Sequence, residues 1–279
     1  MTFAPVPGAL AAELGSAQFA RIRDLMYQVC GVHLRPGKEA LVRSRLARRL
    51  QALALDSFDA YLAHLERDGS GSELREMVES LTTNKTGFFR EPEHFTLLRD
   101  HVKAQVARGS RRLRLWSAGC SSGEEPYTMA MMIDEALAGG PTTDVRILAT
   151  DIASRVLRRA REGVYGARAM DDVPLHYRAR YFGRGDASER DAWRVRDDLR
   201  AMVSVGRLNL AARWPMRGPF DAIFCRNVMI YFDEAMRRSV VERCWELLAP
   251  HGLLFVGHSE SLSAISHRFR YVQPAVYAR

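Results

Sequence analysis

Residues 116–132 read WSAGCSSGEEPYTMAMM, and this stretch fits two different folds and chemistries. Its five residues GCSSG, 119–123, match G-x-S-x-G, the tight strand-to-helix turn that presents a nucleophilic serine in hydrolases. The same residues also form a loop of small side chains between an apolar run and a helical pattern. Such a loop lets a nucleotide-like ligand lie against the start of a helix.

Downstream of residue 111, short apolar runs alternate with helical patterns. The runs typical of strands are LRLWSA (113–118), VRILATD (145–151), AMVSVGRL (201–208), FDAIFC (220–225) and GLLFVG (252–257). Helical periodicity covers EEPYTMAMMIDEAL (124–137), SRVLRRARE (154–162) and EAMRRSVVERCWELL (234–248). This order predicts an α/β fold with a parallel sheet covered on both faces. The final FRYVQPAVYAR (269–279) predicts a closing pair of antiparallel strands.

One polar segment, about 166–200, interrupts the alternation. Within it GRGDASERD (183–191) has the composition of a hairpin turn between HYRARYF (176–182) and AWRVR (192–196). We expect a small inserted β lobe, with a long surface loop as the alternative.

Up to about residue 80 the pattern is helical throughout. Apolar residues return every three or four positions in 19–32, 38–53 and 57–67, and Ser72 is a candidate N-cap for a further helix over 73–81. In the second of these segments one face is apolar and the other is basic. The apolar face holds Val42, Leu46, Leu50 and Leu53, and the basic residues are Arg43, Arg45, Arg48 and Arg49. The basic face is either solvated or a docking surface for an acidic partner.

Composition places the chain among ordinary globular proteins. It is 47% hydrophobic and 27% charged, has no apolar run of the roughly twenty residues that cross a bilayer, and begins without a signal-peptide pattern. We therefore expect a cytoplasmic protein. The net charge of +8 indicates an acidic partner, whether nucleic acid, anionic membrane or protein. The four cysteines are scattered without metal-site spacing, so no metal is expected.

The hydrolase interpretation of GCSSG needs an acid and a histidine after Ser121. Asp151 and His258 stand in the required order. It also needs the helix to follow the serine at once, whereas we expect Gly-Glu-Glu-Pro to intervene, with Pro126 in the first turn. A five-residue match of this kind arises often by chance.

The ligand interpretation rests on polar residues that follow successive strands, because ligands of open α/β sheets bind at the carboxyl ends of the strands. Gly119 follows the first strand, Asp151 ends the second, Asn209 follows the third, and Arg226 with Asn227 follows the fourth. Asp151 is placed to accept hydrogen bonds from a ribose diol. The dinucleotide pattern G-x-G-x-x-G is absent, which argues against NAD.

The helix start after the loop carries two carboxylates, Glu124 and Glu125. They would repel a pyrophosphate but attract S-adenosylmethionine, which carries an ammonium and a sulfonium. The alternative is that they only complement the helix macrodipole.

Five strings of the chain resemble the CheR-type chemotaxis receptor methyltransferases. They are LTTNKTGFFREPEHF (81–95), LWSAGCSSGEEPYTMAM (115–131), LATDIA (148–153), FDAIFCRNVMIYFD (220–233) and GLLFVGHSESL (252–262). The resemblance implies a small all-helical domain over 1–80. It also implies a Rossmann-like class I S-adenosylmethionine methyltransferase domain over 81–279, with an antiparallel β insertion at about 166–200.

The resemblance also implies an activity, a site and partners. The activity is methyl transfer from S-adenosyl-L-methionine to glutamate side chains of chemoreceptors, giving glutamyl methyl esters and S-adenosyl-L-homocysteine. The implied cofactor contacts are Asn84, Thr86, Arg90, Gly119, Glu125, Asp151, Asn209, Leu210, Arg226 and Asn227. Arg90 and Tyr231 are implied to lie near the methyl group. The basic helix would face the acidic receptor bundle, and the β lobe could bind a receptor tail peptide.

Two rival functions stay open at this point. Enzymes that methylate amino groups of adenine or glutamine typically carry Asn/Asp-Pro-Pro-Tyr/Phe after the fourth strand. Arg226-Asn227-Val228-Met229 stands there in this chain, which favours an oxygen nucleophile over nucleic acid. The other rival is a receptor-binding adaptor without turnover. We expect a monomer without membrane insertion, because no unexplained apolar strip stands out.

Overall fold

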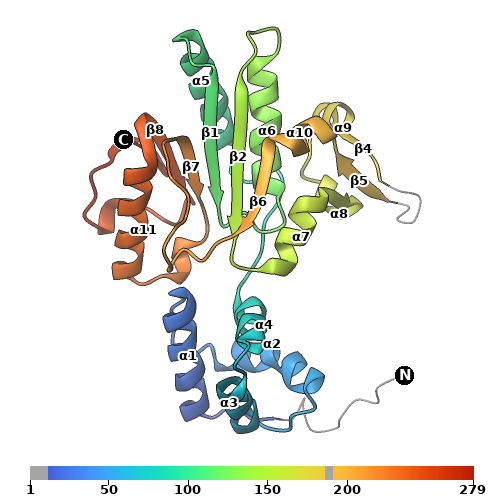
Figure 1. Cartoon of the computed structure of the whole chain (residues 1–279), viewed down its shortest axis with the longest axis vertical. Coiled ribbons are helices and arrows are strands. Elements are labelled where there is room, and N and C mark those ends of the chain that lie inside the picture. The colour runs from blue at the N-terminus through green and yellow to red at the C-terminus, as the bar shows by residue number, and fades with distance from the viewer. Residues whose placement is uncertain (1–11, 186–190) are drawn as a thin grey trace. The chain divides into compact units, whose positions relative to one another are not determined.

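The computed structural model describes residues 12–185 and 191–279, and these divide into two units (Figure 1). The helical unit runs to Thr83 and also includes Tyr231–Asp233. The α/β unit comprises Asn84–Ile230 and Glu234–Arg279. Across the described ranges, no helix combines the length and apolar character needed to cross a membrane.

Four helices build the helical unit. They are α1 (Ser16–Cys30), α2 (Glu39–Ala52), α3 (Phe58–Arg67) and α4 (Ser72–Leu81). The Ser57 side chain caps α3 by accepting a hydrogen bond from Ala60 N at 3.3 Å. The prediction that Ser72 caps α4 is wrong, because Ser72 is already helical. Asp68 Oδ2 instead accepts from the Glu73 amide at 2.7 Å, which ties the preceding turn to the helix start.

Three of the four residues of the apolar face predicted for 38–53 are buried in this unit, and the fourth, Leu53, follows α2 and is half-buried. Val42, Leu46 and Leu50 are inaccessible to solvent, as is Tyr61 of α3. The returning segment Tyr231–Asp233 joins the same unit through its backbone and side chains. The His33 amide donates to Tyr231 O at 2.8 Å, and the Tyr27 hydroxyl donates to Asp233 Oδ2 at 2.7 Å.

The basic residues of α2 separate into two groups. Arg45 donates hydrogen bonds to Leu81 O and to Thr83 Oγ1, and Arg49 pairs with Glu73. Only Arg43 and Arg48 are exposed. Half of the predicted basic face therefore stabilises the helical unit itself.

The α/β unit is built on a seven-stranded sheet with the order β6-β2-β1-β7-β8-β10-β9. Its strands are β1 (Arg112–Ala118), β2 (Asp144–Asp151), β6 (Val203–Arg207), β7 (Phe220–Cys225), β8 (Leu248–Val256), β9 (Arg270–Gln273) and β10 (Val276–Ala278). The first five are parallel, and β10 pairs antiparallel with both β8 and β9. The predicted closing antiparallel pair is confirmed. The strand order reverses between β1 and β7, which is where α/β sheets of this kind open a ligand crevice.

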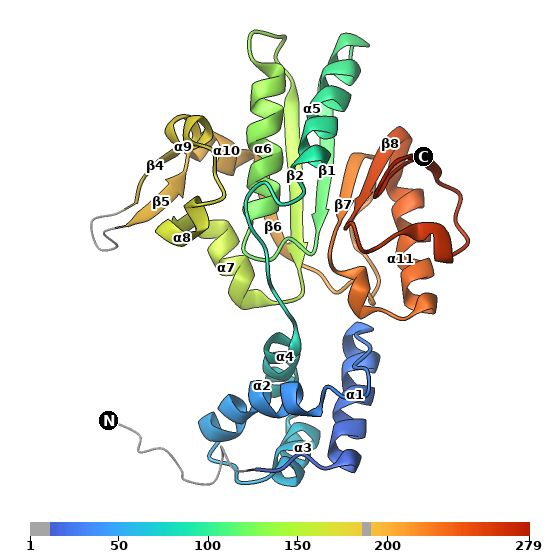
Figure 2. The ribbon, with the colours of Figure 1, turned by 180° about the vertical axis from the view of Figure 1, so that it is seen from behind.

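Helices cover both faces of this sheet (Figures 1 and 2). On one face lie α5 (Pro92–Ala107) and α6 (Glu124–Leu137), and on the other lies α11 (Glu234–Leu247). Helix α7 (Ser154–Glu162) packs on β2 and β6. The sheet shares a hydrophobic core with α5 and α6. It includes Phe224 of β7 together with Phe95 and Leu98 of α5 and Met129 and Ile133 of α6. The near-continuous apolar composition of the strands follows from burial on both faces. The four cysteines are buried free thiols.

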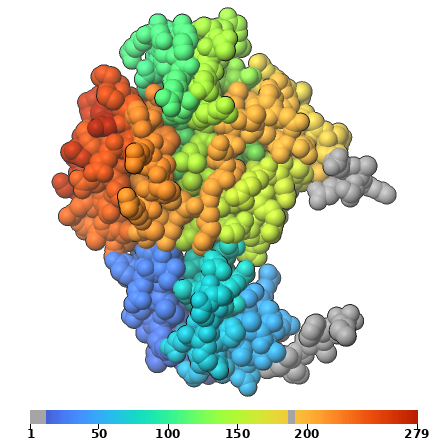
Figure 3. Space-filling model, viewed as in Figure 1, coloured from blue at the N-terminus to red at the C-terminus, as the bar shows by residue number. Residues whose placement is uncertain are grey.

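A second, three-stranded antiparallel sheet forms the inserted lobe, which lies at the surface beside α7 (Figure 3). It consists of β3 (Val164–Gly166), β5 (Ala192–Val195) and β4 (Phe182–Arg184), accompanied by α8 (Ala167–Met170), α9 (Leu175–Tyr181) and α10 (Asp197–Met202). The antiparallel insertion is confirmed, but a strand over HYRARYF is wrong. Tyr177 and Tyr181 stack one helical turn apart, and the Tyr181 hydroxyl donates to Asp134 of α6 at 3.0 Å. The centre of the predicted turn, 186–190, lies outside the described residues.

Together these elements confirm the predicted fold class, which is a helical N-terminal part followed by a Rossmann-like α/β part with a small antiparallel insertion.

Replacing Glu73 with alanine tests the polar centre of the helical unit. The Glu73 side chain is 6% exposed and accepts from Arg49 Nε at 3.0 Å and from the Tyr61 hydroxyl at 2.9 Å. We expect Glu73→Ala to lower the free energy of unfolding by about 2–3 kcal/mol, because it leaves a partly buried guanidinium and a buried hydroxyl without their acceptor. Glu76 is the matched control: it contacts the same arginine at 3.6 Å but is 51% exposed, so Glu76→Ala costs about 0.5 kcal/mol or less. Urea unfolding of the full chain measures both, and equal effects would contradict the assignment.

Candidate functional site at the carboxyl ends of the strands

The loop between β1 and α6 uses a left-handed backbone three times. Gly119, Ser121 and Gly123 have φ values of 86°, 49° and 98°. A Cβ atom at Gly123 would lie 2.8 Å from the Tyr165 hydroxyl oxygen, and one at Gly119 would lie 3.3 Å from Val228 Cβ. Glycine is therefore required at 123 by both backbone conformation and packing. The space beside these glycines is occupied by protein atoms.

The contacts of Ser121 argue against a nucleophilic role. Its hydroxyl donates to the carbonyl oxygen of Asn84 at 3.0 Å, and its amide donates to Asp151 Oδ2 at 2.9 Å. Among the described residues, no histidine is a hydrogen-bond partner of this hydroxyl. One sequence argument against the hydrolase was nevertheless wrong, because α6 begins at Glu124, directly after Gly123, with no spacer.

Asp151 ends β2, as predicted, and is buried at the same sheet edge. Its two carboxylate oxygens accept hydrogen bonds from the amides of Ser121 and Ala153, at 2.9 and 3.0 Å. The carboxylate thus fixes the loop after β1 relative to the loop after β2.

The paired carboxylates at the start of α6 have different environments. The single hydroxyl hydrogen of Ser122 is shared between the two carboxylate oxygens of Glu124, at 2.9 and 2.7 Å, and Glu124 is buried within its own loop. Glu125 accepts from the Ser117 hydroxyl at 2.7 Å and forms an ion pair with Arg226 at 3.0 Å. Burial raises the pKa of both carboxyl groups, although Arg226 opposes this at Glu125.

Arg226 is the centre of the site. Its side chain is 1% exposed and lies between Glu91 at 2.9 Å and Glu125 at 3.0 Å, and it also donates to the Arg90 carbonyl. The guanidinium stands over the ring of Phe95, with 5.4 Å between its carbon and the ring centroid. Burial acts to raise the pKa of Glu91, but the charge of Arg226 and its hydrogen bonds outweigh burial and lower it.

Arg90 is exposed and is held by Asn227. Its Nη2 donates to Asn227 Oδ1 at 2.7 Å, and its Nη1 donates to Lys85 O at 3.0 Å. The adjacent carboxylates Glu91 and Glu93 are alternative partners for Arg90 by their position in the sequence, but each pairs elsewhere: Glu91 with Arg226 at 2.9 Å, and Glu93 with His258 at 2.6 Å.

The other predicted site residues follow β6, precede α5 or belong to the helical unit. Asn209 follows β6, and its Oδ1 accepts from the Ala211 amide at 3.0 Å. Leu210 is buried, and Thr86 is half-buried in the segment before α5. Tyr231 groups with the helical unit.

Sequence reasoning did not assign the buried carboxylate of Glu260. It is 1% exposed and accepts hydrogen bonds from the amides of Asn227, Ile230 and Gly257. Its only signal was its position in the string GLLFVGHSESL, after a strand. Glu91 was considered only as a partner for Arg90, because nothing in the sequence shows which arginine a carboxylate meets.

One group of side chains offers metal-ligand atoms. Glu91, His94 and His258 each place one such atom within 4.8 Å of the others. His94 is fully buried, with Nδ1 3.4 Å from Glu91 Oε2. Because that same Glu91 oxygen already pairs with Arg226, the cluster contains its own cation.

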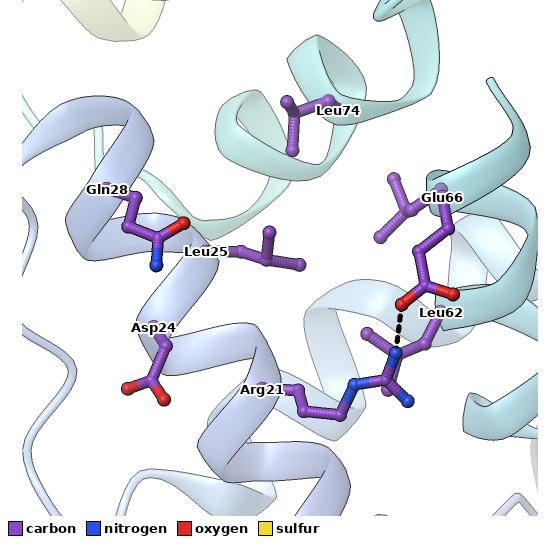
Figure 4. Close-up of a pocket in the computed structure, with 8 residues that line it drawn as sticks. Arg21, Asp24, Leu25, Gln28, Leu62, Glu66 and Leu74 are labelled. Atoms are coloured by element: carbon purple, nitrogen blue, oxygen red, sulfur yellow. Dashed lines mark hydrogen bonds and ion pairs between the residues drawn. The ribbon is translucent and has the colours of Figure 1, made fainter. Parts of the chain in front are cut away.

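The helical unit contains a separate groove of about 280 Å³. Figure 4 shows that α1, α3 and α4 line it, with leucines pointing inward and an Arg21–Glu66 ion pair at its edge. Its lining residues are Arg21, Asp24, Leu25, Gln28, Leu62, Leu65, Glu66 and Leu74. The groove contains none of the predicted site residues.

Acid sensitivity follows from the environment of His94. Burial, aided by the nearby charge of Arg226, lowers the pKa of His94 from 6.5 to about 4. The unfolded chain therefore binds a proton between pH 6.5 and 4 that the folded chain does not, so stability is complete above pH 6.5 and falls as the pH drops to 4. The loss reaches about 3 kcal/mol.

The variant His94→Phe keeps an aromatic ring against Phe255 and removes this titration. Between pH 6.5 and about 4.5 the unfolding free energy of wild type decreases because His94 resists protonation in the folded state. We expect the decrease in His94→Phe to be smaller by about 2 kcal/mol. His251→Asn, a change at an exposed histidine, is measured alongside as the control variant. Urea unfolding at both pH values measures these changes. If the unfolding free energy changed equally with pH in wild type and His94→Phe, His94 would not be the cause of the acid sensitivity.

Comparison with known proteins agrees with this architecture. The family model "CheR methyltransferase, all-alpha domain" matches residues 17–82, and "CheR methyltransferase, SAM binding domain" matches residues 84–278. "Chemotaxis protein methyltransferase 2" of Pseudomonas aeruginosa is 44% identical over 261 residues, which cover 93% of this chain and 92% of that protein. "Chemotaxis protein methyltransferase" of Escherichia coli is 43% identical over 266 residues, covering 95% and 91%. The chain therefore belongs to the CheR family of methyltransferases, whose cofactor is S-adenosyl-L-methionine.

Proposed function

We propose that this protein transfers a methyl group from S-adenosyl-L-methionine to glutamate side-chain carboxylates of chemoreceptors, forming glutamyl methyl esters. The observation that carries the proposal is identity of 44% and 43% to two proteins named as chemotaxis protein methyltransferases, over nearly the whole chain. The sequence after β7 supports it, because Arg226-Asn227-Val228-Met229 stands where an amine-binding Asn/Asp-Pro-Pro-Tyr/Phe string would otherwise lie.

The residues at the strand ends fit the cofactor by their charge. Glu91, Glu125 and Asp151 contribute three carboxylates, whereas Arg226 is the buried cation among them. An excess of negative charge suits a ligand with an ammonium and a sulfonium. We propose that the contacts come from Asn84, Thr86, Arg90, Gly119, Glu125, Asp151, Asn209, Leu210, Arg226 and Asn227.

The chemistry needs positioning more than acid–base catalysis. When bound, the cofactor supplies a methyl group on a sulfonium. A glutamate carboxylate is already ionised near neutral pH, since its reference pKa is about 4.3, so no general base is required. Arg90, which is exposed and fixed by Asn227, is suited to hold one oxygen of the acceptor carboxylate through a charge-assisted hydrogen bond. From the resemblance to the family motif, we propose that Tyr231 lies near the methyl group that is transferred.

The partners follow from the charge of α2 and from the inserted lobe. Arg43 and Arg48, the exposed pair, are proposed to face the acidic helical bundle of a receptor. The lobe is proposed to take a receptor tail peptide along its antiparallel sheet, whose outer strands are β3 and β4. We further infer a cytoplasmic monomer that does not act on nucleic acid.

Methyl transfer to chemoreceptors is measured with radiolabelled S-adenosyl-L-methionine and membranes that contain chemoreceptors. We expect receptor-bound label that mild alkali releases as volatile methanol, because carboxyl methyl esters are base-labile. Arg90→Ala should reduce the initial rate at least about tenfold, since it removes a charge-assisted contact. Cofactor binding without alkali-labile label would refute the acceptor assignment and make nucleic acid the next substrate to test. Binding to the receptor without turnover would instead indicate an adaptor.

Cofactor binding is tested separately by calorimetric titration with S-adenosyl-L-homocysteine. Asp151→Ala should weaken binding at least about tenfold, since it removes a proposed ligand contact and releases the Ser121 amide. Ser121→Ala is the control in the same loop: it keeps the amide that donates to Asp151 and removes only the hydroxyl hydrogen bond to Asn84 O, so it should cost no more than about fivefold, the worth of one hydrogen bond. If Ser121→Ala abolished activity at unchanged affinity, a hydrolase-like role for Ser121 would have to be reconsidered.

A further inference from the structure

The turn after β8 contains a carboxylate with an unusual set of partners. Glu260 Oε2 accepts from the Asn227 amide at 2.6 Å and from the Gly257 amide at 2.7 Å, and its Oε1 accepts from the Ile230 amide at 3.0 Å. The residue is 1% exposed. Two of these three donors belong to the loop that follows β7, so one side chain connects two adjacent strand ends.

That loop carries the residues of the strand-end site. Asn227 has a left-handed backbone, with φ at 59°, and its side chain holds Arg90. The next residue, Val228, lies against Gly119 of the loop after β1, in the space a side chain would fill. A shift of the Asn227 backbone would therefore move the anchor of Arg90 and the wall of the neighbouring loop together.

Gly257 shows how closely the two strand ends approach. A Cβ atom at this position would lie 2.7 Å from Glu260 Oε2 and 3.0 Å from the Asn227 amide nitrogen. Real Cβ atoms essentially never come as close as the first of these distances, and the second is tighter than nine in ten real Cβ contacts. The glycine thus permits the carboxylate to reach the Asn227 amide, and any side chain here would push the two apart.

We infer that Glu260 is a positioning residue for methyl transfer, which fixes the loop after β7 so that Asn227 presents Arg90 to the acceptor carboxylate. This inference rests on the proposed function. A carboxylate suits the role because it only accepts hydrogen bonds, and all three donors are backbone amides. Glutamine has the same shape but would turn an NH₂ group toward at least one of these amides. Burial of a charge is costly, so a surface-like carboxylate placed only for solubility would not occupy this position.

Two variants disturb this contact from opposite sides. Glu260→Gln removes acceptor capacity, and Gly257→Ala wedges the carboxylate away from Asn227 while leaving it intact. Glu246→Gln, the same change at an exposed glutamate of α11, is the control. In the full chain, each is compared with wild type for S-adenosyl-L-homocysteine affinity, for kcat and acceptor KM with receptor membranes, and for Tm.

We expect both variants to lower kcat about 10–100-fold, the usual effect of misplacing a reacting group by about an ångström, with acceptor KM within about twofold. The affinity for S-adenosyl-L-homocysteine should fall in both variants and stay unchanged in the control. If kcat and affinity stay within twofold of wild type in both, whatever happens to Tm, Glu260 has no positioning role. Loss of the cooperative melting transition in both would also overturn the inference, because Glu260 would then determine folding.

The affinity measurement separates this inference from the proposed function. If wild type labels no receptor, the glutamate acceptor is wrong, but wild-type and variant affinities for S-adenosyl-L-homocysteine can still be compared. Equal affinities would then reject a positioning role for Glu260, whatever the acceptor is. Weakened affinities in the variants would support the inference that Glu260 fixes the loop after β7.

Discussion

The buried guanidinium of Arg226 is the interaction on which the site depends. It lies at the carboxyl end of β7 and joins Glu91, before α5, to Glu125, in the first turn of α6. Removal of a charge from water is costly, and only two carboxylates and a carbonyl acceptor in good geometry can offset that cost. Because the partners come from segments far apart in the sequence, this one side chain fixes the register of the loops at the strand ends.

Around this centre, backbone strain is concentrated. Ser121, Asn227 and Glu91 all have positive φ without being glycine. Such conformations persist only where neighbouring contacts over-determine them, and they are common at functional sites. Here the contacts are identifiable: Asp151 holds the Ser121 amide, Glu260 holds the Asn227 amide, and Arg226 holds Glu91. Asp151 and Glu260 thus hold the backbone amides of two of these residues, and Arg226 holds the side chain of the third, Glu91, at the start of α5.

Charge has different uses in the two units. In the helical unit, Arg49 and Arg45 stabilise helix packing. On α2, the positive charges exposed to a partner are therefore those of Arg43 and Arg48. In the α/β unit, charge is internal and mostly negative near the strand ends, which suits a cationic ligand. The overall basic pI therefore describes neither the cofactor site nor the core of the helical unit.

The sequence by itself determined the alternation of strands and helices, the antiparallel closing pair and most helix bounds. These follow from local periodicity, which depends on neighbours three or four residues away, and α6 and α7 match their predicted ranges. It also singled out Asp151 and Asn227, because polar residues at strand ends have a known place in such sheets. It misassigned HYRARYF, where stacking of Tyr177 on Tyr181 and a bond to Asp134 decide for helix. Only the tertiary structure decided which carboxylate meets which arginine and what Glu260 holds, because ion pairs and backbone hydrogen bonds across more than thirty positions leave no periodic trace in a sequence.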